Sequence, residues 1–254
     1  MATSTGAARA AHSRCGVDGN ESVSAGCHGP VGLASPEGVL LAGGVRAVAT
    51  GVAEGDMSGS GSAVDARREA VAAGTWTVLR QAHGGRVVVA ERPGGATGEE
   101  ADAVVSATPG TVLAVLTADC APIVLSSPEG VFGVVHAGWR GLCGGVVGAA
   151  VVALRRLGAG EVEAALGPCI RPCCYAFGPE DLAMVAGRCG PEVIGRDRTG
   201  APALDLPAGV LAALRASGAR LGSVAGTCTG CSGGYWSWRA RGDRQRQVTV
   251  AWRP

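Results

Sequence analysis

Short apolar runs separated by turn-forming residues occupy the centre of the chain, at residues 112–116, 123–125 and 131–135. Continuous apolar runs of this length, bounded by Gly, Pro, Ser or Asp, are typical of strands that are buried on both faces. Further strands are predicted at residues 76–79, 87–89, 162–166, 221–225 and 248–252. The pattern therefore predicts a core that is rich in β-structure.

Helices are predicted between these strands, at residues 63–73, 141–157, 180–188 and 208–216. Several strand pairs are joined by connections too short for a crossover helix, so antiparallel pairs must be present as well. No internal repeat interrupts the alternation. The chain is therefore predicted to be an α/β protein with mixed β-sheets in a single domain.

The first part of the chain differs from the rest in composition. Residues 1–40 are rich in Ala, Gly, Ser and Pro without periodicity, and such a segment cannot bury enough apolar surface to offset the entropy of ordering it. We predict a disordered low-complexity arm at residues 1–40 and a catalytic domain at residues 41–254. The arm carries His12, Cys15, Cys27 and His28, whose spacing fits no closed zinc module and is interpreted as incidental.

Composition and charge exclude several classes of function. All 22 basic residues are Arg, which excludes a phosphate-binding loop that needs Lys and a Schiff-base lysine. The net charge of +1 comes without a basic stripe, so nucleic acid is not an expected partner. The apolar stretch at residues 131–154 is interrupted by His136, Arg140 and several glycines, which argues against a membrane span. Ten cysteines in a long chain without an apolar signal core favour a reduced, cytoplasmic setting.

Three residues with metal-binding side chains stand in Gly-containing motifs next to predicted strands: His83, Cys120 and His136. Each of them alone is more typical of a core or surface residue. Together, two imidazoles and one thiolate at strand ends supply the protein ligands of a catalytic zinc site whose fourth position is open. Asp119, the neighbour of Cys120, is a candidate for orienting a ligand.

Four ordered motifs carry a resemblance to a known family. They are Gln-Ala-His-Gly at 81–84, Thr-Ala-Asp-Cys-Ala-Pro at 117–122, Val-His-Ala-Gly-Trp-Arg-Gly at 135–141, and Gly-Pro-Cys-Ile at 167–170 with Cys-Cys-Tyr at 173–175. Over residues 75–178 the chain resembles the laccase-domain family, also described as metal-dependent purine nucleoside phosphorylases or peptidoglycan editing factors. The resemblance implies an α-β-β-α layered fold, like that of cytotoxic necrotizing factor, and zinc ligands at His83, Cys120 and His136.

The chain departs from the pattern of that family in three places. Residues 45–62 lack the usual N-terminal Arg and Asn motif, and the only Asn in the chain is Asn20. The Tyr-Glu pair of the family is Tyr175-Ala176 here, and its C-terminal aromatic motif reads Trp-Ser-Trp-Arg-Ala-Arg at 236–241. These differences are consistent with altered substrate contacts, or with a degenerate member that binds without turnover.

The older name of such proteins, multicopper polyphenol oxidase, can be tested by counting ligands. A blue-copper centre with a trinuclear cluster needs many imidazoles, and this chain has four His, two of them in the arm. A single copper at His83, Cys120 and His136, with Met57 or Met184 as an axial ligand, is the remaining copper alternative, and zinc is preferred.

With zinc, the resemblance implies two reactions. Phosphate attacks the anomeric carbon of a purine nucleoside, or a hydroxide attacks the ring of adenosine and releases ammonia. The expected partners are therefore a small-molecule purine nucleoside and phosphate. Arg140 is the candidate for holding phosphate, because a guanidinium is a rigid fork of donors. Trp139 is interpreted as a core aromatic, with base stacking as the alternative.

Two alternatives stay open, one that uses the same residues without metal and one that uses other cysteines. In the first, Cys120 is a nucleophile and His136 its general base in a metal-free amidase that acts on a cell-wall precursor, a mechanism that leaves His83 without a role. In the second, cysteines form a structural zinc site. The cysteines concerned are Cys169, Cys173, Cys174, Cys228 and Cys231.

Overall fold

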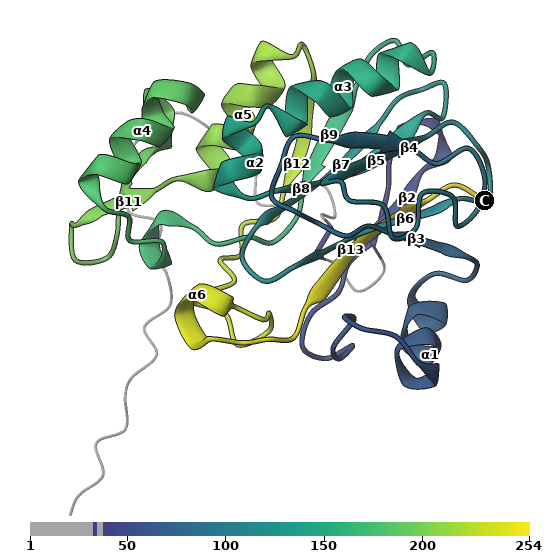
Figure 1. Ribbon diagram of the computed structural model, residues 1–254, viewed down its shortest axis with the longest axis horizontal. Helices are drawn as coiled ribbons and strands as arrows, with labels where there is room; N and C mark the ends of the chain where they lie inside the picture. The colour runs from purple at the N-terminus through teal and green to yellow at the C-terminus, as the bar shows by residue number, and fades with distance from the viewer. Residues whose placement is uncertain (1–32, 35–37) are drawn as a thin grey trace, which may run out of the picture.

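Two large mixed β-sheets stack face to face, with helices on both outer faces, in the computed structural model, which describes residues 33–34 and 38–254 (Figure 1). One sheet has five strands in the order β1 (Val39–Leu40), β2 (Arg46–Ala49), β13 (Gln247–Trp252), β6 (Val112–Thr117) and β3 (Trp76–Val78). The other has six, in the order β12 (Arg220–Val224), β9 (Glu163–Leu166), β7 (Ala121–Ser126), β8 (Phe132–Ala137), β5 (Ala103–Ser106) and β4 (Val87–Val89). Each sheet contains parallel and antiparallel pairs, so the predicted α-β-β-α layering with mixed sheets is confirmed.

Alternation along the central strands explains why two sheets stack. In β6, Leu113 and Val115 pack between the sheets, whereas Val112 and Ala114 face the opposite side, where α1 (Ser62–Val71) lies. Side chains of a strand point to opposite faces in turn, so an unbroken apolar run needs a cover on each face. For β6, the second sheet and α1 provide those covers.

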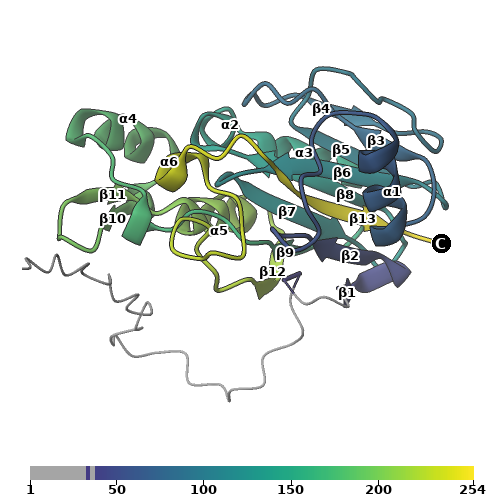
Figure 2. The ribbon, with the colours of Figure 1, turned by 90° about the horizontal axis from the view of Figure 1, so that it is seen from below.

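The six-stranded sheet follows the same rule on its outer face. Ile123 and Leu125 of β7 join a core with α3 (Val146–Arg156) and α5 (Leu206–Ala216), while Val124 between them faces the other sheet. A third long helix, α4 (Pro179–Cys189), extends beyond the sheet together with the short hairpin of β10 (Ile194–Arg196) and β11 (Pro202–Leu204). Figure 2 shows this group at the end of the molecule away from α1. The remaining short helices are η1 (Ala42–Gly44), η2 (Pro172–Cys174), η3 (Pro191–Val193) and α6 (Trp238–Arg241).

The single helix predicted at residues 141–157 is wrong, because two helices occupy this stretch. The first, α2 (Trp139–Cys143), ends at Gly144, and Gly145 has a left-handed backbone with φ 77° before α3 begins. The break allows close approach of another loop, since a Cβ at Gly85 would lie 2.4 Å from the carbonyl oxygen of Gly144. Among the described residues, no helix combines the length and the apolar character that crossing a bilayer requires.

The folded chain begins earlier than residue 41. Leu33 is fully buried, and its carbonyl accepts a hydrogen bond of 2.8 Å from the backbone N–H of Ala49. Strand β1 also lies before residue 41. Residues 1–32 and 35–37 of the predicted arm, including His12, Cys15, Cys27 and His28, lie outside the described residues.

Candidate metal centre

The fold brings His83, Cys120 and His136 together at one end of the stacked sheets. His83 lies in the loop between β3 and β4, Cys120 ends the turn between β6 and β7, and His136 is in β8, where its register partner is Pro122. The ligand atoms of the three lie within 4.8 Å of one another. His136 is 3% exposed and Cys120 is half-buried, while His83 is open to solvent. The group is therefore held from the core side and accessible from outside.

A buried carboxylate, which sequence reasoning missed, contacts the imidazole of His136 and the backbone of His83. Asp102 is 1% exposed, and its carboxylate accepts 2.8 Å from Nδ1 of His136 and 2.9 Å from the backbone N–H of His83. The backbone N–H groups of Ala82 and Gly84 also donate to it, at 3.3 Å and 2.6 Å. Successive backbone N–H groups can converge on one anion, an arrangement called a nest, when a residue among them has a left-handed backbone. His83, with φ 59°, is that residue here. Asp102 thus fixes the His83 loop and leaves Nε2 of His136 for a ligand.

Asp119, the predicted orienting residue, has a different role. Its carboxylate accepts 2.6 Å from the hydroxyl of Thr229 and 2.7 Å from the backbone N–H of Arg239. No hydrogen bond joins it to either histidine in the described part of the chain. Asp119 therefore ties the C-terminal segment to the turn that carries Cys120, and the prediction that it orients a metal ligand is wrong.

Gly138, two residues after His136 in the motif, makes room for the three donors. A Cβ at Gly138 would lie 2.9 Å from Cδ2 of His83 and 3.0 Å from Sγ of Cys120. These separations are shorter than van der Waals contact, so a larger residue would push the ligands apart. At Gly84 a Cβ would meet only Oδ2 of Asp102, at 3.6 Å. Of these two glycines, Gly138 is the one that the geometry requires.

In the metal-free protein, Cys120 and His136 form an ion pair. Burial alone would raise the pKa of the Cys120 thiol, but the charge of His136 and hydrogen bonds from both imidazoles lower it to about 6. Burial alone would lower the pKa of His136, but the Cys120 thiolate and the Asp102 carboxylate raise it to about 9. Near neutral pH the sulfur is therefore a thiolate, the form that binds metal.

This ion pair predicts the pH dependence of alkylation. Because the pKa of Cys120 is lowered, its thiolate persists as the pH falls and is lost only near pH 6. In metal-stripped protein we expect the rate of Cys120 labelling by iodoacetamide to have its midpoint at about 6, and one equivalent of zinc to suppress labelling. Peptide mass spectrometry resolves Cys120 from the other thiols, and the fully buried Cys169 is the unreactive reference. A midpoint at about 8.5, the ordinary cysteine value, would contradict the ion pair.

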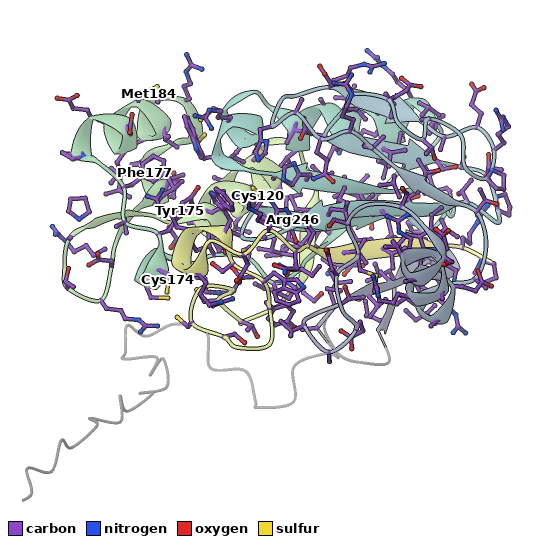
Figure 3. The ribbon with its side chains drawn as sticks, turned by 60° about the horizontal axis from the view of Figure 1, so that its bottom comes forward. Cys120, Cys174, Tyr175, Phe177, Met184 and Arg246 are labelled. Carbon is purple, nitrogen blue, oxygen red and sulfur yellow. The ribbon has the colours of Figure 1, made fainter. Side chains whose placement is uncertain are left out.

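Aromatic side chains line the approach on the α4 side. Tyr175 and Phe177 pack edge to face with ring centroids 5.4 Å apart, and Phe177 meets Trp139 in the same way at 5.9 Å. Burial, followed by the nearby Cys120 thiolate, raises the pKa of Tyr175 above its usual range, so its hydroxyl stays protonated. Figure 3 shows Tyr175 beside Cys120. Trp139 is half-buried in the cluster under α4, which agrees with its interpretation as a core aromatic.

Two arginines accompany these aromatic rings. The guanidinium carbon of Arg140 lies 4.4 Å from the centroid of the Trp139 ring, and that of Arg239 lies 5.4 Å from the centroid of Tyr175. Both arginines are exposed. Sequence reasoning named Arg140 and gave no role to Arg239. Stacking on a ring holds each guanidinium, and that of Arg239 also donates to the carbonyl of Ala176, which leaves its other N–H donors for an anion.

Comparison with known proteins agrees with the geometry of this centre. Residues 45–254 match the family described as multi-copper polyphenol oxidoreductase laccase. The chain belongs to this laccase family. It is 41% identical over 179 residues, which are 68% of this chain and 72% of the relative, to a protein named purine nucleoside phosphorylase in Streptomyces griseus. A relative with the same name in Streptomyces coelicolor is 38% identical, over 68% of this chain and 73% of its own length.

Two solved structures share the fold. YlmD from Geobacillus stearothermophilus superposes with a TM-score of 0.73 at 26% identity, covering 90% of this chain and 97% of YlmD. The YfiH protein of Bacillus licheniformis gives a TM-score of 0.70 at 23% identity, covering 83% and 93%. The second likeness shows the fold alone.

The donors of the laccase-family chain fit a single metal ion better than a copper cluster. His83, Cys120 and His136 offer two nitrogens and a sulfur, and the described residues contain no other histidine. The axial methionines considered for a mononuclear copper are not part of the centre. Met57 is fully buried in the core beside Trp76, and Met184 is exposed on α4, away from Cys120 in Figure 3.

Proposed function

We propose that the chain is a zinc-dependent purine nucleoside phosphorylase, with zinc held by His83, Cys120 and His136. The observation that carries the proposal is the convergence of the three donors on one point, with Asp102 holding both histidines and solvent reaching His83. Two nitrogens and a sulfur with an open fourth position are typical of a catalytic rather than a structural zinc site. The relatives named purine nucleoside phosphorylase support the choice of reaction.

Phosphate is the substrate that the arginines favour. Arg140 is the second residue of α2, two positions after Gly138, and the close approach of Gly138 to His83 and Cys120 places the start of this helix beside the three donors. Arg239 lies over Tyr175 and adds a second cation beside the centre. We assign Arg140 to hold the phosphate through paired N–H donors, with Arg239 adding positive potential.

The reaction requires little covalent participation from the protein. A phosphate oxygen bonds to the anomeric carbon, the carbon–nitrogen bond to the purine breaks, and the electron pair leaves with the base, which takes up a proton. Bound zinc would supply a Lewis acid that polarises a substrate oxygen. Arg140 would orient the nucleophile, and Tyr175 would present a protonated hydroxyl. Inosine, adenosine and guanosine are the expected substrates, and adenosine is also the substrate for deamination at the same centre.

A Cys-His amidase acting on a cell-wall precursor is the second candidate, because metal-free Cys120 and His136 form a thiolate and imidazolium pair. That mechanism leaves His83 without a role. The structure nevertheless devotes three backbone N–H groups and a buried carboxylate to the loop that holds His83. Such an arrangement is expected for a metal ligand and not for a bystander.

Replacing His83 with alanine separates the two candidates. We expect His83→Ala to lose phosphate-dependent release of hypoxanthine from inosine, because a zinc ligand is gone, while a Cys120 and His136 dyad would keep most of its activity. The assay follows hypoxanthine with and without phosphate, and inosine formation from adenosine reports deamination. Arg86→Ala is the control, since Arg86 lies on the same loop and its guanidinium makes only exposed contacts, an ion pair with Glu99 and a hydrogen bond to the carbonyl of Glu100. Full phosphorolysis by His83→Ala would reject the zinc mechanism.

A further inference from the structure

A second group of sulfurs lies outside the centre described above. Cys173 and Cys174 end η2, and Cys228 and Cys231 lie in the loop between β12 and α6. The four Sγ atoms lie within 4.8 Å of one another. Two segments that are far apart in the sequence therefore place four thiols at one point.

The spacing of the sulfurs matches a metal tetrahedron. Zinc–sulfur bonds of about 2.3 Å with tetrahedral angles place sulfurs about 3.8 Å apart. The separations here are 3.3 Å for Cys173 to Cys231 and 3.4 Å for Cys174 to Cys231, with 4.8 Å as the upper limit for the group. These two separations are also far longer than the bond of about 2.05 Å in a disulfide. Both separations thus fall slightly short of the value expected around one zinc ion, and the 4.8 Å limit allows the other separations within the group to reach it.

The surrounding backbone is built for this approach. The N–H of Arg171 donates to Sγ of Cys228 at 3.4 Å, and the N–H of Thr229 donates to the carbonyl of Cys169 at 3.2 Å, which joins the two segments. A Cβ at Gly230 would lie only 2.7 Å from Cβ of Cys174. The loop can reach η2 because Gly230 has no side chain. The N–H of Arg171, aimed at the sulfur of Cys228, stabilises the thiolate form of that cysteine.

A cation also faces the sulfurs. The guanidinium of Arg198, from the turn between β10 and β11, donates to Sγ of Cys231 and lies 3.9 Å from Sγ of Cys174. Four thiolates around a divalent ion leave a net charge of −2, which an adjacent guanidinium partly offsets. Thiolates alone select soft or borderline ions such as zinc over magnesium or calcium.

We propose that Cys173, Cys174, Cys228 and Cys231 bind a structural zinc ion in a closed tetrathiolate site. The sequence grouping included Cys169, but Cys169 is not part of the group of four. The site would clamp the loop between β12 and α6 onto η2. That loop carries Thr229, whose hydroxyl holds Asp119 beside Cys120, so the clamp would brace the catalytic end of the molecule. The proposal is independent of the phosphorylase assignment.

Metal content of the full chain tests the site. We expect two zinc ions per wild-type chain by mass spectrometry after dialysis, one in Cys120→Ala and one in Cys231→Ser. Cys143→Ser is the matched control, because Cys143 is also half-buried and 3.2 Å from the sulfur of Cys189 but belongs to neither group. It should retain two. A wild type with a single zinc that disappears in Cys120→Ala would overturn the proposal.

Cobalt substitution gives a readout that leaves the four cysteines intact. Cys120→Ala loaded with Co²⁺ should show intense thiolate-to-cobalt charge transfer and the visible bands of a tetrahedral ion. Wild type should add the weaker contribution of a centre with one thiolate. If Cys231→Ser fails to fold, the spectrum of Cys120→Ala still decides. Absence of charge transfer in that variant would show that the four sulfurs do not form a metal site.

Discussion

Cys120→Ala is expected to fold normally, to lose the metal bound with His83 and His136, and to lose phosphate-dependent release of purine base. The side chain is half-buried in a turn, so its removal costs little packing. The loss of function follows from the ligand count, since two imidazoles remain where three donors converged. Changes to residues that only support a ligand typically cost about 10-fold to 100-fold in metal affinity, so the loss of a ligand itself should exceed about 100-fold.

The measurement pairs a zinc competition titration with inosine turnover on the same samples. Cys143→Ala is the matched control, because it removes a half-buried thiol from α2 without touching His83, Cys120 or His136. Circular dichroism of the metal-free proteins separates loss of ligand from loss of fold. If Cys120→Ala keeps both the zinc affinity of this centre and phosphorolysis, Cys120 is not a ligand of the proposed site.

The central strands, and the proximity of Cys120 to His136, were predictable from the sequence for a local reason. Residues 112–116, 123–125 and 131–135 are apolar because both of their faces are buried, and β6, β7 and β8 extend these runs by only a few residues. Short turns between such strands leave few places for His136 and Cys120 other than one shared end of the sheets. Local pattern and proximity are therefore linked for these residues.

Elements defined by distant contacts were not predictable. Residues 103–106 form β5, which lies between β8 and the edge strand β4 of the six-stranded sheet, yet four residues with a terminal Ser carry too little pattern to stand out. The break at Gly145 has a local signal in the Gly144-Gly145 pair, but the approach of Gly85 to the carbonyl of Gly144, which uses this break, is a distant contact. For the four sulfurs, the sequence indicated a possible zinc site among five cysteines, but which four of them meet depends on how two loops pack.

Asp102 and Asp119, the two aspartates near the metal centre, show most clearly what sequence alone could not predict. Asp119 was the prediction because it precedes Cys120, but sequence adjacency places neighbouring side chains in different directions at a turn, and Asp119 has φ 99°. Asp102 precedes a buried strand and has no motif around it. Its role arises from the pairing of β5 with β8, which sets its carboxylate against Nδ1 of His136. A lone acidic residue ahead of an apolar run was the only available signal.

The second large effect is expected from Asp102→Asn. The substitution keeps the shape but replaces one carboxylate oxygen with an NH2 group, so at least two of the four donors around it lose an acceptor. Each buried donor left unpaired costs about 1–3 kcal/mol. We expect the free energy of unfolding to fall by several kcal/mol, and the metal affinity to fall by about 10-fold to 100-fold, because His83 and His136 lose their common support.

Asp119→Asn is the control that separates a positioning role from general destabilisation. Asp119 is also buried, at 7% exposure. Its carboxylate accepts two hydrogen bonds, and both come from the C-terminal segment. Both variants should therefore unfold more easily, and only Asp102→Asn should lose metal affinity in excess of its loss of stability. Chelator competition at a denaturant concentration well below unfolding, compared with unfolding of the metal-free chains, resolves the two quantities. If Asp119→Asn weakens metal binding as much as Asp102→Asn does, Asp102 has no specific role in positioning the histidines.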